Sequence, residues 1–145
     1  MKIIFGYYDD EDFGLTEYPE IIESEKNEEV SDEEYEQEKE KVEQYRKYLV
    51  TGIMEDFQYP ESCDEVLVAI KDIENGKSFG TEWDGQAFQH EITPHYVQFV
   101  HTIFGDSEEY PVWTCRLKEY KKVLHAWKSF LELPKDLESR IEVSV

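Results

Sequence analysis

The chain has 145 residues, of which 35 are acidic and 15 are lysine or arginine, so its formal net charge at pH 7 is −20. Such a charge repels nucleic acid and anionic membranes and favours a basic protein partner. Hydrophobic residues make up 39% of the chain and aromatic residues 14%, more than a disordered acidic chain carries. The length fits a single domain over residues 1–145 with a core of its own.

No apolar run approaches the roughly 18–20 residues that a membrane span requires. The first six residues are too short for a secretory leader and run into Asp9-Asp10-Glu11-Asp12, which makes the cytoplasm the default location. Cys63 and Cys115 have no C-x-x-C spacing. In a reducing compartment such cysteines are usually small buried hydrophobic residues, although a disulfide or a reactive thiol stays open.

The acidic residues are concentrated in the first third of the chain. Residues 1–45 hold 17 acids and four lysines, a formal charge of −13. Within this acidic third, β-favouring side chains predict a strand over residues 2–8, a charged loop over 9–13 and a short strand over 18–22, which Pro19 marks as an edge strand or a strand start.

A helix is predicted to follow Ser31, because Ser31 and Glu34 have the spacing of a capping box. The helix should run to about residue 48, with a narrow apolar stripe that places it on the surface, and Gly52 and Pro60 should bracket a loop. A second capping box, Ser62 to Glu65, predicts a core helix over residues 62–75.

From residue 77 the hydrophobic period changes from 3.6 to 2, which predicts a three-stranded antiparallel meander over residues 77–104. Asp84-Gly85 and Thr93-Pro94 are its turn signals. A closing helix should cover residues 114–133, and the tail at 141–145 could add an edge strand. The predicted fold is therefore α+β, with a central antiparallel meander and two to three helices packed on it.

Motifs for catalysis or for a cofactor are absent from this sequence. The run of acids at 9–12 lacks the alternating spacing of a calcium loop, so no metal site is expected. No two histidines have a metal-ligand spacing, and the expected strand register sets His90 opposite Val97 and His101 opposite Gln86, so their rings should not converge. Lysines on the closing helix should pair with acids of the first helix or be solvated, because a chain of this charge does not attract phosphate polymers.

These features favour a binding protein that covers a cationic surface on another protein. Exposed acids would steer the encounter, and a few aromatic anchors would supply affinity. The candidate contact residues are Asp9, Asp10, Glu11, Asp12, Glu33, Glu34, Trp83 and Asp84.

A resemblance supports this interpretation. The Glu82-Trp83-Asp84-Gly85 hairpin and the closing-helix pattern of Tyr120, Trp127, Phe130 and Leu131 resemble those of bacterial immunity proteins that neutralise ribonuclease toxins in contact-dependent growth inhibition and related polymorphic toxin systems. The resemblance spans residues 77–133. It implies a cytoplasmic, non-enzymatic protein without a cofactor that binds one cognate basic nuclease and blocks its active site or substrate groove. The acidic third lies outside it, so placing the interface there is a separate inference.

Two alternatives stay open. The chain could be a small hydrolase that uses Glu82 or Glu91 with His90 or His101, or a regulatory adaptor without a nuclease target. Salt distinguishes the first alternative from toxin binding, because binding through exposed acids weakens as salt rises, whereas catalysis by a buried pair does not.

Overall fold

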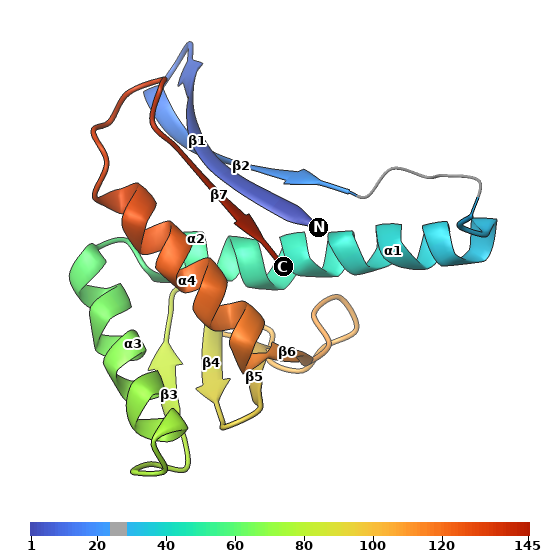
Figure 1. The fold of residues 1–145 in the computed structure, drawn as a ribbon, viewed down its shortest axis with the longest axis vertical. Helices are drawn as coiled ribbons and strands as arrows, with labels where there is room; N and C mark the ends of the chain where they lie inside the picture. Colours follow the sequence, from blue (N-terminus) through green and yellow to red (C-terminus); the bar gives the residue numbers. More distant parts are fainter. Residues whose placement is uncertain (24–28) are drawn as a thin grey trace.

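The computed structural model describes residues 1–23 and 29–145, and it has an α+β fold (Figure 1). Two antiparallel sheets, of three and four strands, lie on either side of the helix α4 (Leu117–Leu131). The predicted fold class is confirmed, but the sequence had suggested one central sheet rather than two. No helix within the described ranges is both long and apolar enough to cross a membrane.

The first sheet has the order β2-β1-β7 and is built from both ends of the chain. Strand β1 (Lys2–Asp10) lies between β2 (Gly14–Ile22) and β7 (Arg140–Ser144). The predicted tail strand is therefore confirmed, and Pro19 lies in an edge strand as expected. The predicted loop over 9–13 is too long, because the pairing of β1 with β2 continues to the partners Asp10 and Gly14.

The acidic helix α1 (Asp32–Gln44) begins with the predicted capping box: Ser31 Oγ accepts the Glu34 N–H at 3.2 Å, and the Glu34 carboxylate accepts the Ser31 N–H at 3.2 Å. The helix does not end near residue 48. It continues through a π-helical segment, η1 (Tyr45–Val50), into α2 (Thr51–Asp56).

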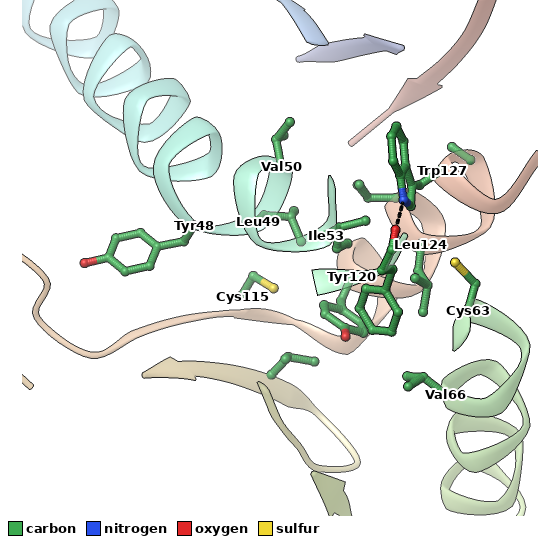
Figure 2. Packing of buried hydrophobic residues seen from close by; sticks show 14 of the residues in the cluster. Tyr48, Leu49, Val50, Ile53, Cys63, Val66, Cys115, Tyr120, Leu124 and Trp127 are labelled. Atoms are coloured by element: carbon green, nitrogen blue, oxygen red, sulfur yellow. Dashed lines mark hydrogen bonds between the residues drawn. The ribbon is translucent and has the colours of Figure 1, made fainter. Parts of the chain in front are cut away.

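The prediction that this helix stays on the surface is wrong for its second half. Tyr48, Leu49 and Val50 are consecutive and all buried. This is possible because the segment passes between the two sheets: Tyr48 packs on Phe88 of the second sheet, whereas Val50 points towards the strands of the first (Figure 2). The amphipathic pattern that marks a surface helix is lost where both sides of a helix are covered.

The expected loop between Gly52 and Pro60 is also shorter than predicted. Gly52 lies inside α2, where a Cβ atom would come within 3.1 Å of Phe99 and 3.2 Å of Phe88, so glycine lets the second sheet approach the helix. Helix α3 (Pro60–Glu74) begins at Pro60 with Tyr59 as its N-cap. The capping box predicted at Ser62 is therefore wrong, because proline in the first turn starts the helix two residues earlier.

The second sheet has the order β3-β4-β5-β6. The predicted meander is confirmed as β3 (Thr81–Asp84), β4 (Phe88–Ile92) and β5 (Tyr96–His101). The sequence missed β6 (Trp113–Arg116), which pairs with β5 and takes up the first residues of the predicted closing helix.

The register of β4 and β5 differs from the prediction: each strand partner is shifted by two residues, because the turn lies one residue further along the chain. His90 lies opposite Phe99 rather than Val97, and His101 lies opposite Phe88 rather than Gln86. The turn after β4 is centred between Pro94 and His95, one position further along than Thr93-Pro94.

One hydrophobic cluster joins the two sheets through α4 (Figure 2). The Trp127 ring packs on Phe5 of the first sheet, with ring centroids 5.1 Å apart, and its Nε1–H donates to the Phe57 carbonyl oxygen at 2.6 Å. Cys63 and Cys115 lie in this cluster as free, buried thiols, as predicted. Burial raises the pKa of the Cys63 thiol to about 12 and also raises that of Cys115, so both thiols stay protonated.

Candidate functional site

The β1–β2 hairpin presents most of the predicted contact acids, but they do not all have the same role. The Asp10 carboxylate accepts the N–H groups of Asp12 at 2.8 Å and Phe13 at 3.0 Å and so closes the turn. These two backbone bonds hold the pKa of Asp10 below its usual value. Asp9, Glu11 and Asp12 are exposed, and none of them forms an ion pair with a residue that the structure describes. Asp10 therefore shapes the turn, and its three neighbours are free to meet a partner.

Three exposed aromatic side chains lie on the same hairpin as these acids. Tyr8 is 41% exposed, Tyr18 is 53% exposed and Phe13, at the tip, is 84% exposed. Tyr8 and Tyr18 pack edge to face across the two strands with centroids 5.6 Å apart. Together these side chains form what we call the hairpin surface, which comprises Tyr8, Asp9, Glu11, Asp12, Phe13 and Tyr18.

The base of the hairpin is anchored in the core, so the hairpin surface is held in place. Phe5 is fully buried, and Tyr7 packs on Phe130 of α4 at 4.8 Å between ring centroids. The tip extends past the helices at one end of the molecule (Figure 1).

Glu33 and Glu34 lie in the first turn of α1, far from the hairpin tip (Figure 1). Glu34 is occupied by its capping bond to Ser31, whereas Glu33 is exposed on the acidic outer face of the helix. The structure therefore does not bring Glu33 and Glu34 together with the acids at 9–12 into one contact site.

Trp83, predicted to be an interface anchor, packs within the protein instead. Its ring stacks on Phe57 with centroids 5.0 Å apart and planes 13° apart, and its Nε1–H donates to the Asp56 carbonyl oxygen at 3.0 Å. Asp84 is exposed and accepts a bond from the Gln89 side chain at 3.1 Å. The structure therefore does not group Trp83 and Asp84 with the acids at 9–12, and their contact with a partner stays a prediction.

The most constrained polar site is a buried network that the sequence did not indicate. His90 is fully buried; its Nε2 lies 2.7 Å from Asp56 Oδ2 and its Nδ1 lies 2.8 Å from the Tyr120 hydroxyl. The same Asp56 carboxylate accepts the backbone N–H groups of Ala87 at 2.7 Å and Phe88 at 3.1 Å. Asp56 thus ties the end of α2 to the β3–β4 hairpin.

The bonding pattern fixes the protonation of the imidazole. A carboxylate only accepts, so Nε2 carries the proton towards Asp56, and Nδ1 accepts the proton of the Tyr120 hydroxyl. Burial lowers the pKa of His90, against the opposing hydrogen bond and charge of Asp56, and burial raises the pKa of Tyr120. Neutral His90 can therefore donate to Asp56 and accept from Tyr120 at the same time. A buried network in which every polar group is hydrogen-bonded stabilises the fold.

Gly85 is required by this network rather than by a two-residue turn. Its φ is not positive, and the connection between β3 and β4 takes residues 85–87. A Cβ atom on Gly85 would lie 2.1 Å from Asp56 Cγ. In the sequence, Asp84-Gly85 indicates only a turn, and no local pattern points from Gly85 to Asp56.

We expect Gly85→Ala to lower the free energy of unfolding by about 2–4 kcal/mol, because the new methyl group displaces the Asp56 carboxylate from its bonds. Urea unfolding of the variant measures this change. Gly6→Ala is the control, because its Cβ would meet only the Ser139 carbonyl oxygen at 3.8 Å, an ordinary contact. Equal losses in the two variants would contradict the role given to Asp56.

A pH dependence follows from the lowered pKa of His90. The unfolded imidazole binds a proton near pH 6.5, whereas the folded one stays neutral, so the unfolded state binds more protons below that pH. Stability should fall as the pH drops from 7 to 5.5, with a contribution from His90 of at most about 1.4 kcal/mol per pH unit. Urea titrations of the wild type and of His90→Gln isolate this term, and parallel pH profiles would contradict it.

In the hydrolase alternative, Glu82 and Glu91 lie opposite each other in β3 and β4, but the two histidines are engaged elsewhere. His90 is closed off by Asp56 and Tyr120, Glu82 is exposed on the sheet edge, and the His101 Nδ1 accepts the N–H groups of Ile103 and Phe104 at 3.2 and 3.1 Å. Within the described ranges, no three His, Cys, Asp or Glu side chains are grouped to hold a metal ion.

Comparisons with known protein families, with curated proteins and with solved structures found no match. The surfaces of this chain are therefore the evidence for its function.

Proposed function

We propose that this chain is a cytoplasmic immunity protein that binds and neutralises a basic nuclease toxin through the hairpin surface. The class of nuclease that we propose is a ribonuclease. It would act stoichiometrically, without catalysis and without a cofactor. The observation that carries the proposal is that one hairpin anchored in the core presents three exposed aromatic rings and three exposed acids that pair with no described cation.

The two kinds of side chain have complementary effects in binding. Exposed carboxylates raise the rate of encounter with a cationic protein, and aromatic side chains that become buried at the centre of an interface supply most of the affinity. Exposed Tyr and Phe beside acids are what such a contact needs, whereas acids alone give a surface that is merely well hydrated.

The shape of the hairpin suggests where it would bind. A nuclease holds its substrate in a cationic groove, because the groove must neutralise phosphates. A projecting hairpin with carboxylates at its tip can enter such a groove and occupy the phosphate positions. The proposed mode of inhibition is therefore direct blockage of the substrate groove.

Helix α1 would contribute to the long-range electrostatic attraction between the chain and a cationic partner. Its exposed face carries Glu33, Glu36, Glu40 and Glu43 at helical spacing. Because this face lies far from the hairpin tip, it would add to the steering field rather than to the same contact.

The test begins with the neighbouring gene, which should encode a large secreted protein that ends in a basic nuclease domain. Purified chain should abolish RNA cleavage by that domain at a molar ratio of one to one. Inhibition should weaken as salt rises from 50 to 500 mM. Full nuclease activity in the presence of excess chain at 50 mM salt would contradict the proposal.

A further inference from the structure

A cationic pocket lies on this acidic protein, away from the hairpin surface. The pocket has a volume of about 600 Å³, within the range of small-molecule sites. It lies between the C-terminal end of α3, the β4–β5 turn and the first two turns of α4. Four of the fifteen lysine and arginine residues of the chain and two of its four histidines line it, against one acid. The basic lining residues are Arg116, Lys118, Lys121, Lys122, His95 and His125.

Three of these cations lack a partner within the described part of the chain. Lys121 pairs at 2.8 Å with Glu74 of α3 and not with an acid of the first helix, whereas Lys118 and Lys122 are exposed, the other outcome that the sequence allowed. Lys128, outside the pocket, also pairs with α3, at 2.7 Å from Asp64. Arg116, Lys118 and Lys122 form no ion pair with a described residue, although 35 acids are available in the chain.

The placement of these cations is unfavourable for the helix itself. Lys118 and Lys122 are four residues apart on α4, and like charges at that spacing destabilise a helix. Lys118 also lies in the first turn of α4, where the helix dipole favours anions. Sequences usually avoid such conflicts except at functional sites, where a ligand compensates for them.

The local environment of His125 is consistent with a positive pocket. Burial lowers the pKa of His125, and the positive charges of Lys121 and Lys128 lower it further, against Asp64 and Glu74. Of the charged side chains that line the pocket, four are cationic and one, Glu74, is acidic.

We propose that this pocket binds a small organic phosphate, such as a nucleotide, with the phosphates on Lys118, Lys122 and Arg116 and the organic part against Pro94 and Leu117. The two apolar residues line the same pocket as the cations. Screening over about 8 Å lets a small dianion respond to the nearby cations, whereas a long phosphate polymer also meets the acidic remainder of the surface. This inference is independent of the proposed immunity function.

Calorimetric titration at 150 mM salt with ADP, pyrophosphate, adenosine and a 20-nucleotide RNA tests the proposal. ADP should bind one to one with a Kd below about 0.1 mM. Pyrophosphate should bind at least fivefold more weakly, and adenosine should not bind. Absence of ADP binding up to 5 mM would overturn the proposal. Equal binding of pyrophosphate and ADP would overturn the role of the apolar wall, and tighter binding of RNA than of ADP would overturn the choice of a small ligand.

The variant Lys118→Gln/Lys122→Gln should weaken ADP binding at least tenfold. The matched control, Lys77→Gln/Lys135→Gln, removes the same charge from exposed positions outside the pocket and should bind ADP like the wild type. Thermal unfolding without ligand gives a second readout: the pocket variant should be as stable as the wild type or more so, because the repulsion on α4 is relieved. Equal ADP affinity in the two variants, or a pocket variant less stable than the control, would contradict the site.

Discussion

Replacing Asp56 by alanine is expected to lower the free energy of unfolding by about 4 kcal/mol, the largest effect of any single substitution considered for this chain. The change would leave His90 Nε2–H and the N–H groups of Ala87 and Phe88 without acceptors in the interior. A domain of this size has a total stability of about 5–15 kcal/mol, so the variant should be close to unfolding at 37 °C.

The control for this substitution is Asp64→Ala. Asp64 also forms a close ion pair, at 2.7 Å from Lys128, but both side chains reach solvent, so the loss should stay below about 1 kcal/mol. Urea unfolding monitored by circular dichroism compares the two variants. If Asp56→Ala were no less stable than Asp64→Ala, the buried network would not hold α2 to the second sheet.

Neutralising the acids of the hairpin surface should have the largest effect on partner binding. The variant Asp9→Asn/Glu11→Gln/Asp12→Asn keeps the turn, because Asp10 is retained. We expect it to bind the cognate nuclease about 30–100-fold more weakly at 50 mM salt, mainly through a slower association rate. Surface plasmon resonance measures both rates, and the difference from the wild type should shrink at 500 mM salt.

A control of equal net charge separates local contact from the overall field. Glu65→Gln/Glu108→Gln/Glu109→Gln removes three exposed acids far along the chain from the hairpin and should lower the association rate only slightly. Phe13→Ala should instead raise the dissociation rate and leave stability unchanged, since the ring is largely exposed in the free protein. Equal losses in the two charge variants would show that only net charge matters.

The elements that the sequence predicts well are those whose signals are local. The Ser31 capping box depends on side chains three residues apart, and the period-2 alternation of β4 and β5 depends on their own residues. The elements that it misses depend on distant partners. Trp113–Arg116 becomes a strand because β5 offers a free edge, and the second half of the long helix is buried because two sheets, remote in sequence, close on it.

The same difference between local and distant signals decides which residues of the candidate sites can be predicted from the sequence. Exposed acids at the hairpin tip can be identified from a charged run between two strands, but the separation of turn-forming Asp10 from Asp9 and Asp12 needs coordinates. Asp56 and His90 are 34 residues apart, and neither lies in a recognisable motif. The stacking of Trp83 on Phe57 is likewise not readable from the sequence, because an aromatic residue near a turn gives the same pattern whether its ring contacts solvent or another ring.

The most direct test of the central claim, that the hairpin surface is the contact for a cationic protein, is chemical-shift mapping of the isotope-labelled chain with the unlabelled nuclease domain of the neighbouring gene. The account predicts that the largest shift changes fall on residues 8–18 and that saturation occurs at one equivalent. Large changes confined to other surfaces, with residues 8–18 unaffected at saturation, would contradict it.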